Sequence, residues 1–252
     1  PGMWRRLPAP DAASESLNPG NETIESWIFV AHVWVLPDYF ALMKAYGARR
    51  LVAVSSTSQF TKVESSVSAE RDVAARLATG EEKVAAWCRD NGVTWTVLRP
   101  TLIYGGGRDR NIEAVSRFAR RFRFFPLLGA ASGLRQPIHY EDVAGACVAA
   151  LASDRTANRA YNISGGEVLS FREMVRRVFA QLGQRAVMVP IPLALIKFGV
   201  AMARLVPSLR HWSPAMAERM NKDMVFDHAD AERDFGFAPR RFVLTDRDVQ
   251  PG

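Results

Sequence analysis

The sequence predicts an α/β fold in which a parallel sheet is flanked by helices and joined to a small, mostly helical lobe. Two observations predict the sheet. Short, continuous apolar runs alternate with longer helical patterns between residues 27 and 110, and turn residues such as Gly47 and Gly92 separate them. Such runs are typical of parallel strands that are buried on both faces and joined by crossover helices. After about residue 110 the pattern changes to helices with short strands, which predicts the lobe.

The expected elements follow in chain order. Residues 1–25 are rich in Pro, Ser, Asn and Gly and predict an irregular N-terminal arm. We expect strands at 27–31, 51–54, 94–98, 135–138, 160–163 and 187–189. We expect helices at 37–46, 69–90, 112–121, 140–151 and 171–182, with further helical segments toward the C-terminus. Pro37 suits a first helical turn, and Gly47 and Gly92 suit the ends of two helices.

Charge and composition narrow the classes of partner. The net charge of +7, carried mostly by arginine, is compatible with nucleic acid, an anionic membrane or a phosphorylated substrate, although biased codon usage explains it equally well. Arginines and phenylalanines alternate over residues 117–125, as on surfaces that stack bases. An amphipathic helix with its phenylalanines turned inward explains the same pattern. We therefore expect a small-molecule substrate and no nucleic-acid partner.

The cysteines and the most apolar stretch bear on location. Cys88 and Cys147 lie in apolar helical patterns without metal-ligand spacing, so we expect reduced core thiols, no metal site and a cytoplasmic protein. Proline and charged residues interrupt residues 187–206, so no transmembrane span is expected there. An amphipathic helix over a substrate pocket is our interpretation of this stretch, and a contact with a membrane surface is the alternative.

Five short motifs together carry a resemblance to a known family. They lie at 54–57 (V-S-S-T), 98–105 (L-R-P-T-L-I-Y-G), 135–143 (R-Q-P-I-H-Y-E-D-V), 161–166 (Y-N-I-S-G-G) and 235–240 (F-G-F-A-P-R). In this order and spacing the chain resembles the NAD-dependent epimerase/dehydratase family, a branch of the extended or atypical short-chain dehydrogenases/reductases. The resemblance implies a Rossmann-like fold, NAD or NADP as cofactor, and a nucleotide sugar or another hydroxyl or carbonyl compound as substrate.

The same resemblance indicates what this chain lacks. In the family a glycine-rich phosphate loop precedes the strand expected at 27–31, whereas Gly2 and Gly20 are the only glycines here before Gly47. Three further glycines at 105–107 follow a later strand, and we interpret them as a flexible turn. We therefore expect the N-terminal strands to be missing from this chain, strand 27–31 to form a sheet edge, and no NAD(P) binding by the chain alone. Because of the open edge, we expect the chain to be less stable than a whole family member, to form a homodimer, or to be covered by the arm at 1–25.

Three regions result from this interpretation. Residues 1–25 form the irregular arm and residues 26–110 a partial Rossmann-like dinucleotide-binding domain. Residues 111–252 form the C-terminal part with the substrate lobe, and strand 160–164 returns from that part to the main sheet.

The proton-transfer machinery of the family is a tyrosine with a lysine four residues later on the same helix face. Aligned on Glu81, these two positions hold Val73 and Leu77, which continue an apolar stripe through Cys88. Losing a positioned acid or base costs about 10²–10⁴-fold in rate, so we expect impaired oxidoreduction. A non-catalytic nucleotide-binding, regulatory or assembly module, or a truncated non-functional fragment, is the alternative. Glu81, Glu82 and Lys83 are interpreted as solvated helix charges, and a substitute acid/base set is the alternative.

The resemblance also implies candidate site residues. Thr57, or its neighbour Ser56, corresponds to the hydroxyl that orients the substrate oxygen, and a turn or helix-capping hydroxyl is the alternative. Tyr104 is the nearby phenol that could substitute as a proton donor, and a packed turn aromatic is the alternative. The residues expected beside the cofactor are Ala31, His32, Ser55, Pro100, Thr101 and Ile103.

Arg135 and His139 flank the segment that meets a nucleotide-sugar diphosphate in the family, so they are the candidate substrate-binding residues. A guanidinium fork matches the geometry of a diphosphate. A surface salt bridge is the alternative for Arg135.

Overall fold

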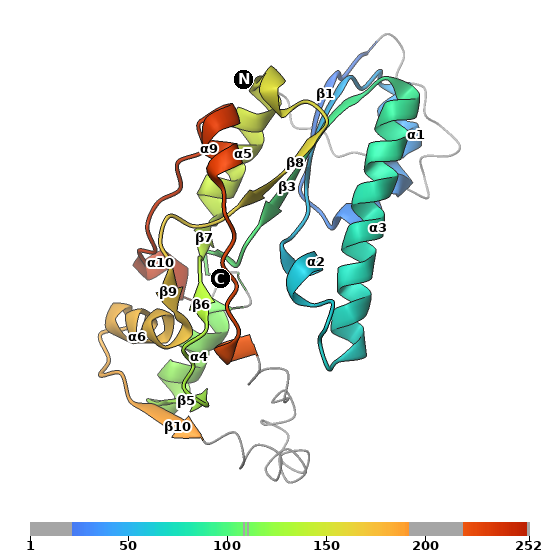
Figure 1. Ribbon diagram of the computed structural model, residues 1–252. Helices are drawn as coiled ribbons and strands as arrows, with labels where there is room; N and C mark the ends of the chain where they lie inside the picture. Colours follow the sequence, from blue (N-terminus) through green and yellow to red (C-terminus); the bar gives the residue numbers. More distant parts are fainter. Residues whose placement is uncertain (1–21, 108, 110, 192–218, 251–252) are drawn as a thin grey trace.

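A computed structural model describes residues 22–107, 109, 111–191 and 219–250 of this chain (Figure 1). Most of the expected N-terminal arm and the greater part of the apolar stretch at 187–206 lie outside the described residues. No helix among the described residues is long and apolar enough to cross a membrane.

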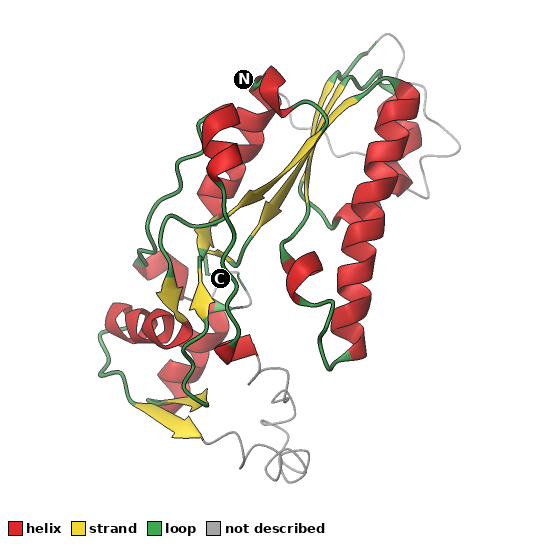
Figure 2. Cartoon of the chain, viewed as in Figure 1, coloured by secondary structure: helices red, strands yellow, loops and turns green. Residues whose placement is uncertain are grey.

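The core of the molecule is a four-stranded parallel sheet between two layers of helices (Figures 1 and 2). Its strands, in spatial order, are β1 (Ser26–Phe29), β2 (Arg50–Val54), β3 (Thr94–Pro100) and β8 (Arg159–Ile163). One face is covered by η1 (Val33–Tyr39), α1 (Phe40–Ala45) and α3 (Ser68–Asn91), and the other by α5 (Tyr140–Ala152) and α9 (Ala229–Phe235). The parallel α/β architecture predicted from the apolar runs is confirmed.

Strand β2 shows why these runs form a doubly covered sheet. Leu51 and Ala53 pack toward α3, whereas Val52 and Val54 pack toward α5. Successive side chains point to opposite faces of a strand, so an unbroken apolar sequence fills two cores at once.

Helix α3 begins and ends within one residue of its predicted bounds. Leu77 and Cys88 lie in the core beneath the helix, as the apolar stripe predicts. A Cβ at Gly80 would lie 3.0 Å from the backbone nitrogen of Trp34, so this glycine permits the close approach of η1. Gly92 ends the helix in the left-handed conformation, with φ of 67°.

Strand β1 is an edge strand of the described sheet, as predicted. It pairs with β2 on one side, and the described residues place no strand on its other side. Ile28 is 40% exposed and Val30 is 74% exposed.

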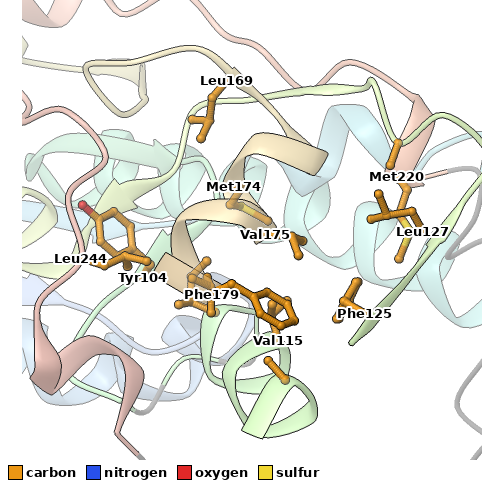
Figure 3. Close-up of a cluster of buried hydrophobic side chains, with 14 of the residues drawn as sticks. Tyr104, Val115, Phe125, Leu127, Leu169, Met174, Val175, Phe179, Met220 and Leu244 are labelled. Atoms are coloured by element: carbon orange, nitrogen blue, oxygen red, sulfur yellow. The ribbon is translucent and has the colours of Figure 1, made fainter. Parts of the chain in front are cut away.

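The lobe has its own apolar core (Figure 3). Helices α4 (Ile112–Phe122) and α6 (Phe171–Gln181) pack there against strand β5 (Phe125–Leu128), which pairs in parallel with β10 (Met188–Ile191). Phe125 and Phe179 are buried aromatic side chains of this core. Strand β5 is absent from the sequence prediction because it includes Pro126, which a two-stranded ladder tolerates on its free side.

The single strand expected at 135–138 forms two shorter ones. Strand β6 (Leu134–Arg135) pairs antiparallel with β9 (Leu169–Ser170), and β7 (Ile138–His139) pairs in parallel with β4 (Ile103–Tyr104). Pro137 separates them and cannot donate to either ladder. The remaining described elements are α2 (Ser58–Thr61), η2 (Asp154–Thr156) and α10 (Asp246–Val249).

Candidate functional site

A cleft of about 1160 Å³ opens where strands β1, β2 and β3 end at their carboxyl edge. Ligands of open parallel sheets bind at this edge, and the volume suits a small organic molecule. The residues of the sheet, of α2 and α3, and of the lobe that line the cleft include His32, Ser56, Thr57, Ser58, Thr61, Lys62, Glu70, Thr101, Ile103, Asp109, Arg135, Tyr140 and Arg219.

Hydroxyl groups from two neighbouring strands meet in this cleft. The backbone N–H and the hydroxyl of Thr57 both donate to the carbonyl oxygen of Pro100, each at 3.1 Å. The hydroxyl of Thr101 donates to the carbonyl oxygen of Gln136 at 2.5 Å. A donating hydroxyl keeps two lone pairs, so each of these oxygens can accept a hydrogen bond from a ligand.

The structure brings six of the predicted site residues to the cleft wall and leaves five outside it. The six that line the cleft are His32, Ser56, Thr57, Thr101, Ile103 and Arg135, and the five outside its lining are Ala31, Ser55, Pro100, Tyr104 and His139. Their chemical roles remain predictions.

Ser55 lies behind the cleft in a buried polar cluster. Its hydroxyl donates to Glu81 Oε1 at 2.5 Å, and the same oxygen accepts from Gln59 Nε2 at 2.7 Å. The other carboxylate oxygen accepts from Arg99 Nη2 at 2.5 Å. The interpretation of Glu81 as a solvated helix charge is therefore wrong. Its carboxylate is buried and forms an ion pair with Arg99 of the central strand β3.

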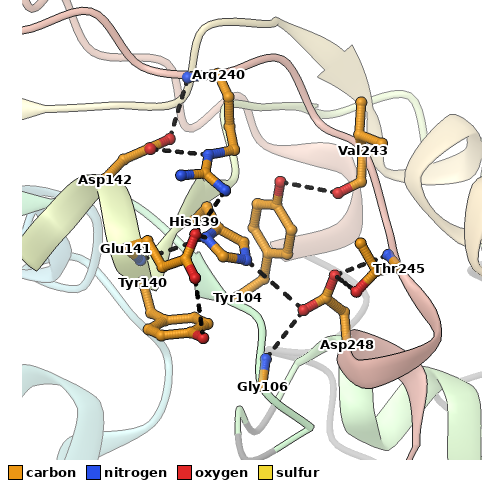
Figure 4. Close-up of polar contacts among 10 residues, drawn as sticks. All are labelled: Tyr104, Gly106, His139, Tyr140, Glu141, Asp142, Arg240, Val243, Thr245 and Asp248. Carbon is orange, nitrogen blue, oxygen red and sulfur yellow. Dashed lines mark hydrogen bonds and ion pairs between the residues drawn. The ribbon is translucent and has the colours of Figure 1, made fainter.

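Tyr104 is fully buried in the core of the lobe (Figure 4). Its hydroxyl donates to the carbonyl oxygen of Val243 at 3.2 Å, and its ring packs edge-on against Phe242. Burial raises the pKa of this phenol to about 12. This environment matches the packed-aromatic alternative and keeps the hydroxyl out of the cleft lining.

His139 is the N-cap residue of helix α5, and its ring packs against the glycine loop (Figure 4). Its Nδ1 accepts the backbone N–H of Glu141 at 3.3 Å, which caps the helix. Its Nε2 lies 3.6 Å from Asp248 Oδ1, on the short helix α10.

The three glycines at 105–107 have positive φ, and 106–107 form a turn, as interpreted; Gly105 and Gly107 pack closely against neighbouring segments. A Cβ at Gly105 would lie 2.6 Å from Tyr140 Cδ1 and 2.7 Å from His139 Nε2. The N–H of Gly106 donates to Asp248 Oδ1 at 3.0 Å, and that of Gly105 donates to Asp109 Oδ2 at 3.5 Å. Because carboxylates already occupy these amides, the loop offers no cradle for a pyrophosphate.

Arg135 is buried at the lobe side of the cleft, so it is not the surface salt bridge of the alternative interpretation. Its Nη1 donates to the carbonyl oxygens of Leu134 and Lys222, both at 2.7 Å, and its Nη2 donates to that of Arg219. Burial lowers the pKa of Arg135 to about 10. The Arg135 guanidinium therefore links two segments of the chain through hydrogen bonds to backbone carbonyls, which leaves few of its N–H groups for a ligand.

Sequence reasoning missed several polar residues of the cleft, among them Lys62, Glu70, Tyr140 and Arg219. Lys62 follows the short helix α2, and Arg219 comes from a distant segment of the chain. The local pattern gives no signal for either. Tyr140 begins α5 beside His139, so its place in the 135–143 motif was the available signal.

The face of α3 that carries the tyrosine–lysine pair in the family is apolar here. Leu77 is buried against Val84 and Cys88, and Val73 packs half-buried against the same cluster. Neither side chain lines the cleft. Within the described part of the chain, the cleft thus has hydroxyls, cations and one phenol, Tyr140, but no such pair on α3.

The sequence matches the NAD dependent epimerase/dehydratase family over residues 15–164. The parallel sheet and the cleft at its carboxyl edge agree with this match. The chain therefore belongs to that family. Its fold is accordingly that of the Rossmann-like, extended short-chain dehydrogenases/reductases.

Two known proteins are similar in sequence to this chain over most of its length. Uncharacterized protein y4nG of Sinorhizobium fredii is 27% identical over 205 residues, which cover 78% of this chain and 50% of that protein. The 2-alkyl-3-oxoalkanoate reductase of Stenotrophomonas maltophilia is 28% identical over 232 residues, covering 83% of this chain and 70% of that enzyme.

A solved structure shares the fold at low sequence identity. UDP-glucuronic acid 4-epimerase from Bacillus cereus, in complex with UDP-glucuronic acid and NAD, superposes with a TM-score of 0.58 and 15% identity. The match covers 81% of this chain and 62% of the epimerase. The chain thus spans half the length of y4nG and less than two thirds of this epimerase.

Proposed function

We propose that this chain forms the substrate side of an NAD(P)-dependent epimerase/dehydratase-type site. The cleft would take a small hydroxyl or carbonyl compound, with a nucleotide sugar as the leading class, beside the nicotinamide of NAD or NADP. The observation that carries the proposal is the position of the cleft, at the carboxyl ends of three parallel strands and lined by the hydroxyls of Ser56, Thr57 and Thr101.

The residues that line the cleft fit the substrate and the nicotinamide, but the glycine loop does not fit the pyrophosphate of the cofactor. Ser56 and Thr57 would orient the reacting oxygen of the substrate, and His32, Thr101 and Ile103 would border the nicotinamide. When bound, the nicotinamide supplies hydride transfer. The described glycine loop is not free to hold its pyrophosphate, because Asp109 and Asp248 accept from the loop amides. We therefore propose that this chain alone does not bind NAD(P).

The relatives support the breadth of the substrate class. The epimerase structure holds a nucleotide sugar, and the reductase is named for a substrate that has both a carbonyl and a carboxylate. Both ligands carry an oxygen at the reacting carbon and a negative charge elsewhere in the molecule.

A second candidate is a binding or assembly module without turnover. The packing of Val73 and Leu77 into the core favours it, because neither position can supply the family's proton transfer. Both candidates require a ligand in the cleft, but only the first requires that the bound ligand is converted to a product.

Binding is tested with UDP-glucose and a variant that fills the cleft. Isothermal titration should detect UDP-glucose binding to the unmodified chain. Thr61→Trp, within the lining, should weaken it by at least about tenfold. Thr79→Trp, at an exposed position of α3, is the matched control and should leave it unchanged. Equal binding by all three proteins, or no binding by any, would refute the proposal.

Turnover tests the first candidate. The chain is incubated with UDP-glucose and NAD, and UDP-galactose is quantified by chromatography. Measurable conversion would exclude the module and refute the proposal that this chain alone does not bind NAD(P), whereas binding without conversion is expected of the chain alone under both candidates.

Two further expectations belong to the same proposal. The free, buried thiols of Cys88 and Cys147 support a cytoplasmic location. The open edge of β1 supports a homodimer, which sedimentation velocity tests directly.

A further inference from the structure

Among the described residues, three cationic side chains, Lys62, Arg135 and Arg219, line the cleft, and the guanidinium of Arg135 already donates to backbone carbonyls. Lys62 directly follows α2, the short helix that Thr57 precedes and Thr61 ends. Arg219 belongs to the segment that Arg135 ties to the lobe through a backbone carbonyl. Two elements far apart in the sequence therefore place positive charge in the same cavity.

Arg219 has an acidic partner in the cleft, whereas Lys62 does not. The guanidinium of Arg219 pairs with Glu70 Oε1, and the second oxygen of Glu70 accepts the hydroxyl of Ser65 at 2.7 Å. The ammonium of Lys62 makes no hydrogen bond or ion pair with any residue in the described part of the chain. The half-buried Lys62 thus adds a positive charge that no described carboxylate balances.

The other carboxylates near this end are already engaged. Asp109 also lines the cleft, but its Oδ1 accepts the backbone N–H groups of Asn111 at 2.9 Å and Ile112 at 2.5 Å. Glu64 lies 3.9 Å from the ammonium of Lys222, outside the cleft lining. Neither carboxylate is positioned to neutralise Lys62.

The pKa values of Lys62 and Arg219 are both lowered, as expected for cations in a partly buried site. Burial, together with the nearby Arg219 guanidinium, lowers the pKa of Lys62, and burial also lowers that of Arg219. Both shifts mean that the charged forms are disfavoured in this environment, and an anion beside them would reverse the effect.

We propose that Lys62, with Arg219 beside it, binds an anionic group of the substrate, a phosphate or a carboxylate, next to the hydroxyls of α2. This inference rests on the proposed function, since it places the anion on the ligand of the same cleft. It also makes the cleft selective, because a neutral ligand would leave the Lys62 ammonium unpaired and partly desolvated.

Inorganic phosphate and acetate are the probes for this site. Each is titrated into the ¹⁵N-labelled chain, and the amide shifts of Thr61 and Lys62 give its dissociation constant. Lys62→Met should weaken binding by about tenfold or more, the size expected for a charge-assisted hydrogen bond. Lys62→Arg keeps the charge and should bind within about threefold of the unmodified chain.

Lys222→Met is the matched control, because it removes the same charge from a neighbouring lysine outside the cleft lining and should leave binding within about twofold. Circular dichroism establishes that each variant is folded. Shifts caused by phosphate alone identify a phosphate ligand, shifts caused by acetate alone identify a carboxylate, and shifts caused by both support an anion site that accepts either group. Absence of anion binding, or equal loss in Lys62→Met and Lys222→Met, would overturn the inference.

The two proposals fail in different ways. If UDP-glucose binds but neither anion does, the anion site is refuted and the proposed function stands. If phosphate binds in a Lys62-dependent manner while UDP-glucose does not bind, the anion site stands and the proposed function is refuted.

Discussion

Glu81 illustrates at the residue scale how a charged position on a helix becomes part of the interior. Its carboxylate accepts hydrogen bonds from Ser55, Gln59 and Arg99, each at 2.5–2.7 Å for the closest pair of atoms, and joins α3 to the ends of β2 and β3. A buried ion pair adds little net stability, but removing one partner leaves the other charge buried and unpaired.

Glu81→Gln should therefore lower the free energy of unfolding by about 2–3 kcal/mol, since Arg99 loses its counterion. Glu82→Gln, exposed on the same helix, should change it by less than about 0.5 kcal/mol. Urea denaturation measures both. Equal, small effects would mean that the Glu81 cluster does not hold α3 to the sheet.

Tyr104 gives a prediction for alkaline pH. Burial raises its pKa from 10.0 to about 12, so the unfolded chain loses this proton before the folded chain does. The contribution of the buried phenol to stability is complete below about pH 10 and is lost as the pH rises toward 12.

Tyr104→Phe should therefore make the alkaline fall in stability shallower, although buried groups such as Cys88 and Tyr161, whose pKa values are also raised to about 12, still contribute. Urea denaturation between pH 8 and 12 measures this. Tyr140→Phe, at an exposed phenol, is the control and should leave the slope unchanged. A steep fall that persists in Tyr104→Phe would contradict the buried position of this phenol.

At the scale of the element, α3 has an apolar face at the positions where the resemblance predicts the family's acid and base. Leu77→Lys places an ammonium in the core that Leu77 shares with Cys88 and should cost more than about 3 kcal/mol of stability. Ala75→Lys, on the exposed side of the same helix, should cost less than about 0.5 kcal/mol. Thermal or urea unfolding compares them. If Leu77→Lys is as stable as Ala75→Lys, this face of α3 is not core.

The elements predicted well from the sequence are those with strong periodicity and clear ends. Helix α3 has a long apolar stripe and a left-handed Gly92 at its end. Strand β2 has a continuous apolar run over 51–54, and β3 has only β-branched, aromatic or aliphatic residues over 94–98. The two-residue strands of the lobe were missed or merged, because pairs such as β4 with β7 form only when distant segments meet. The local sequence does not indicate which distant segment each short strand pairs with.

The candidate site divides in the same way. The hydroxyls of Ser56 and Thr57 were predictable from a motif at the end of a strand, and the cleft includes them. Lys62 and Arg219 were missed because they meet only through tertiary structure. Glu81 was misassigned because the counterion that buries it, Arg99, lies in another element.

At the scale of the whole molecule, β1 is one of the two edge strands of the described sheet. The amides of β1 that face away from β2 have no strand partner among the described residues, whereas β3 pairs on both sides with β2 and β8. Hydrogen exchange followed by mass spectrometry should show much weaker protection in residues 26–29 than in residues 94–98. Equal protection of both strands would show that this edge is covered in solution.

The central claim is that the cleft forms the substrate half of a dinucleotide-type site, while the described glycine loop offers no phosphate cradle. The most direct measurement is a pair of titrations of the unmodified chain, one with UDP-glucose and one with NADH, followed by tryptophan fluorescence. The account predicts saturable UDP-glucose binding with a dissociation constant below about 1 mM and no response to NADH. Micromolar NADH binding, with no binding of UDP-glucose, would contradict it.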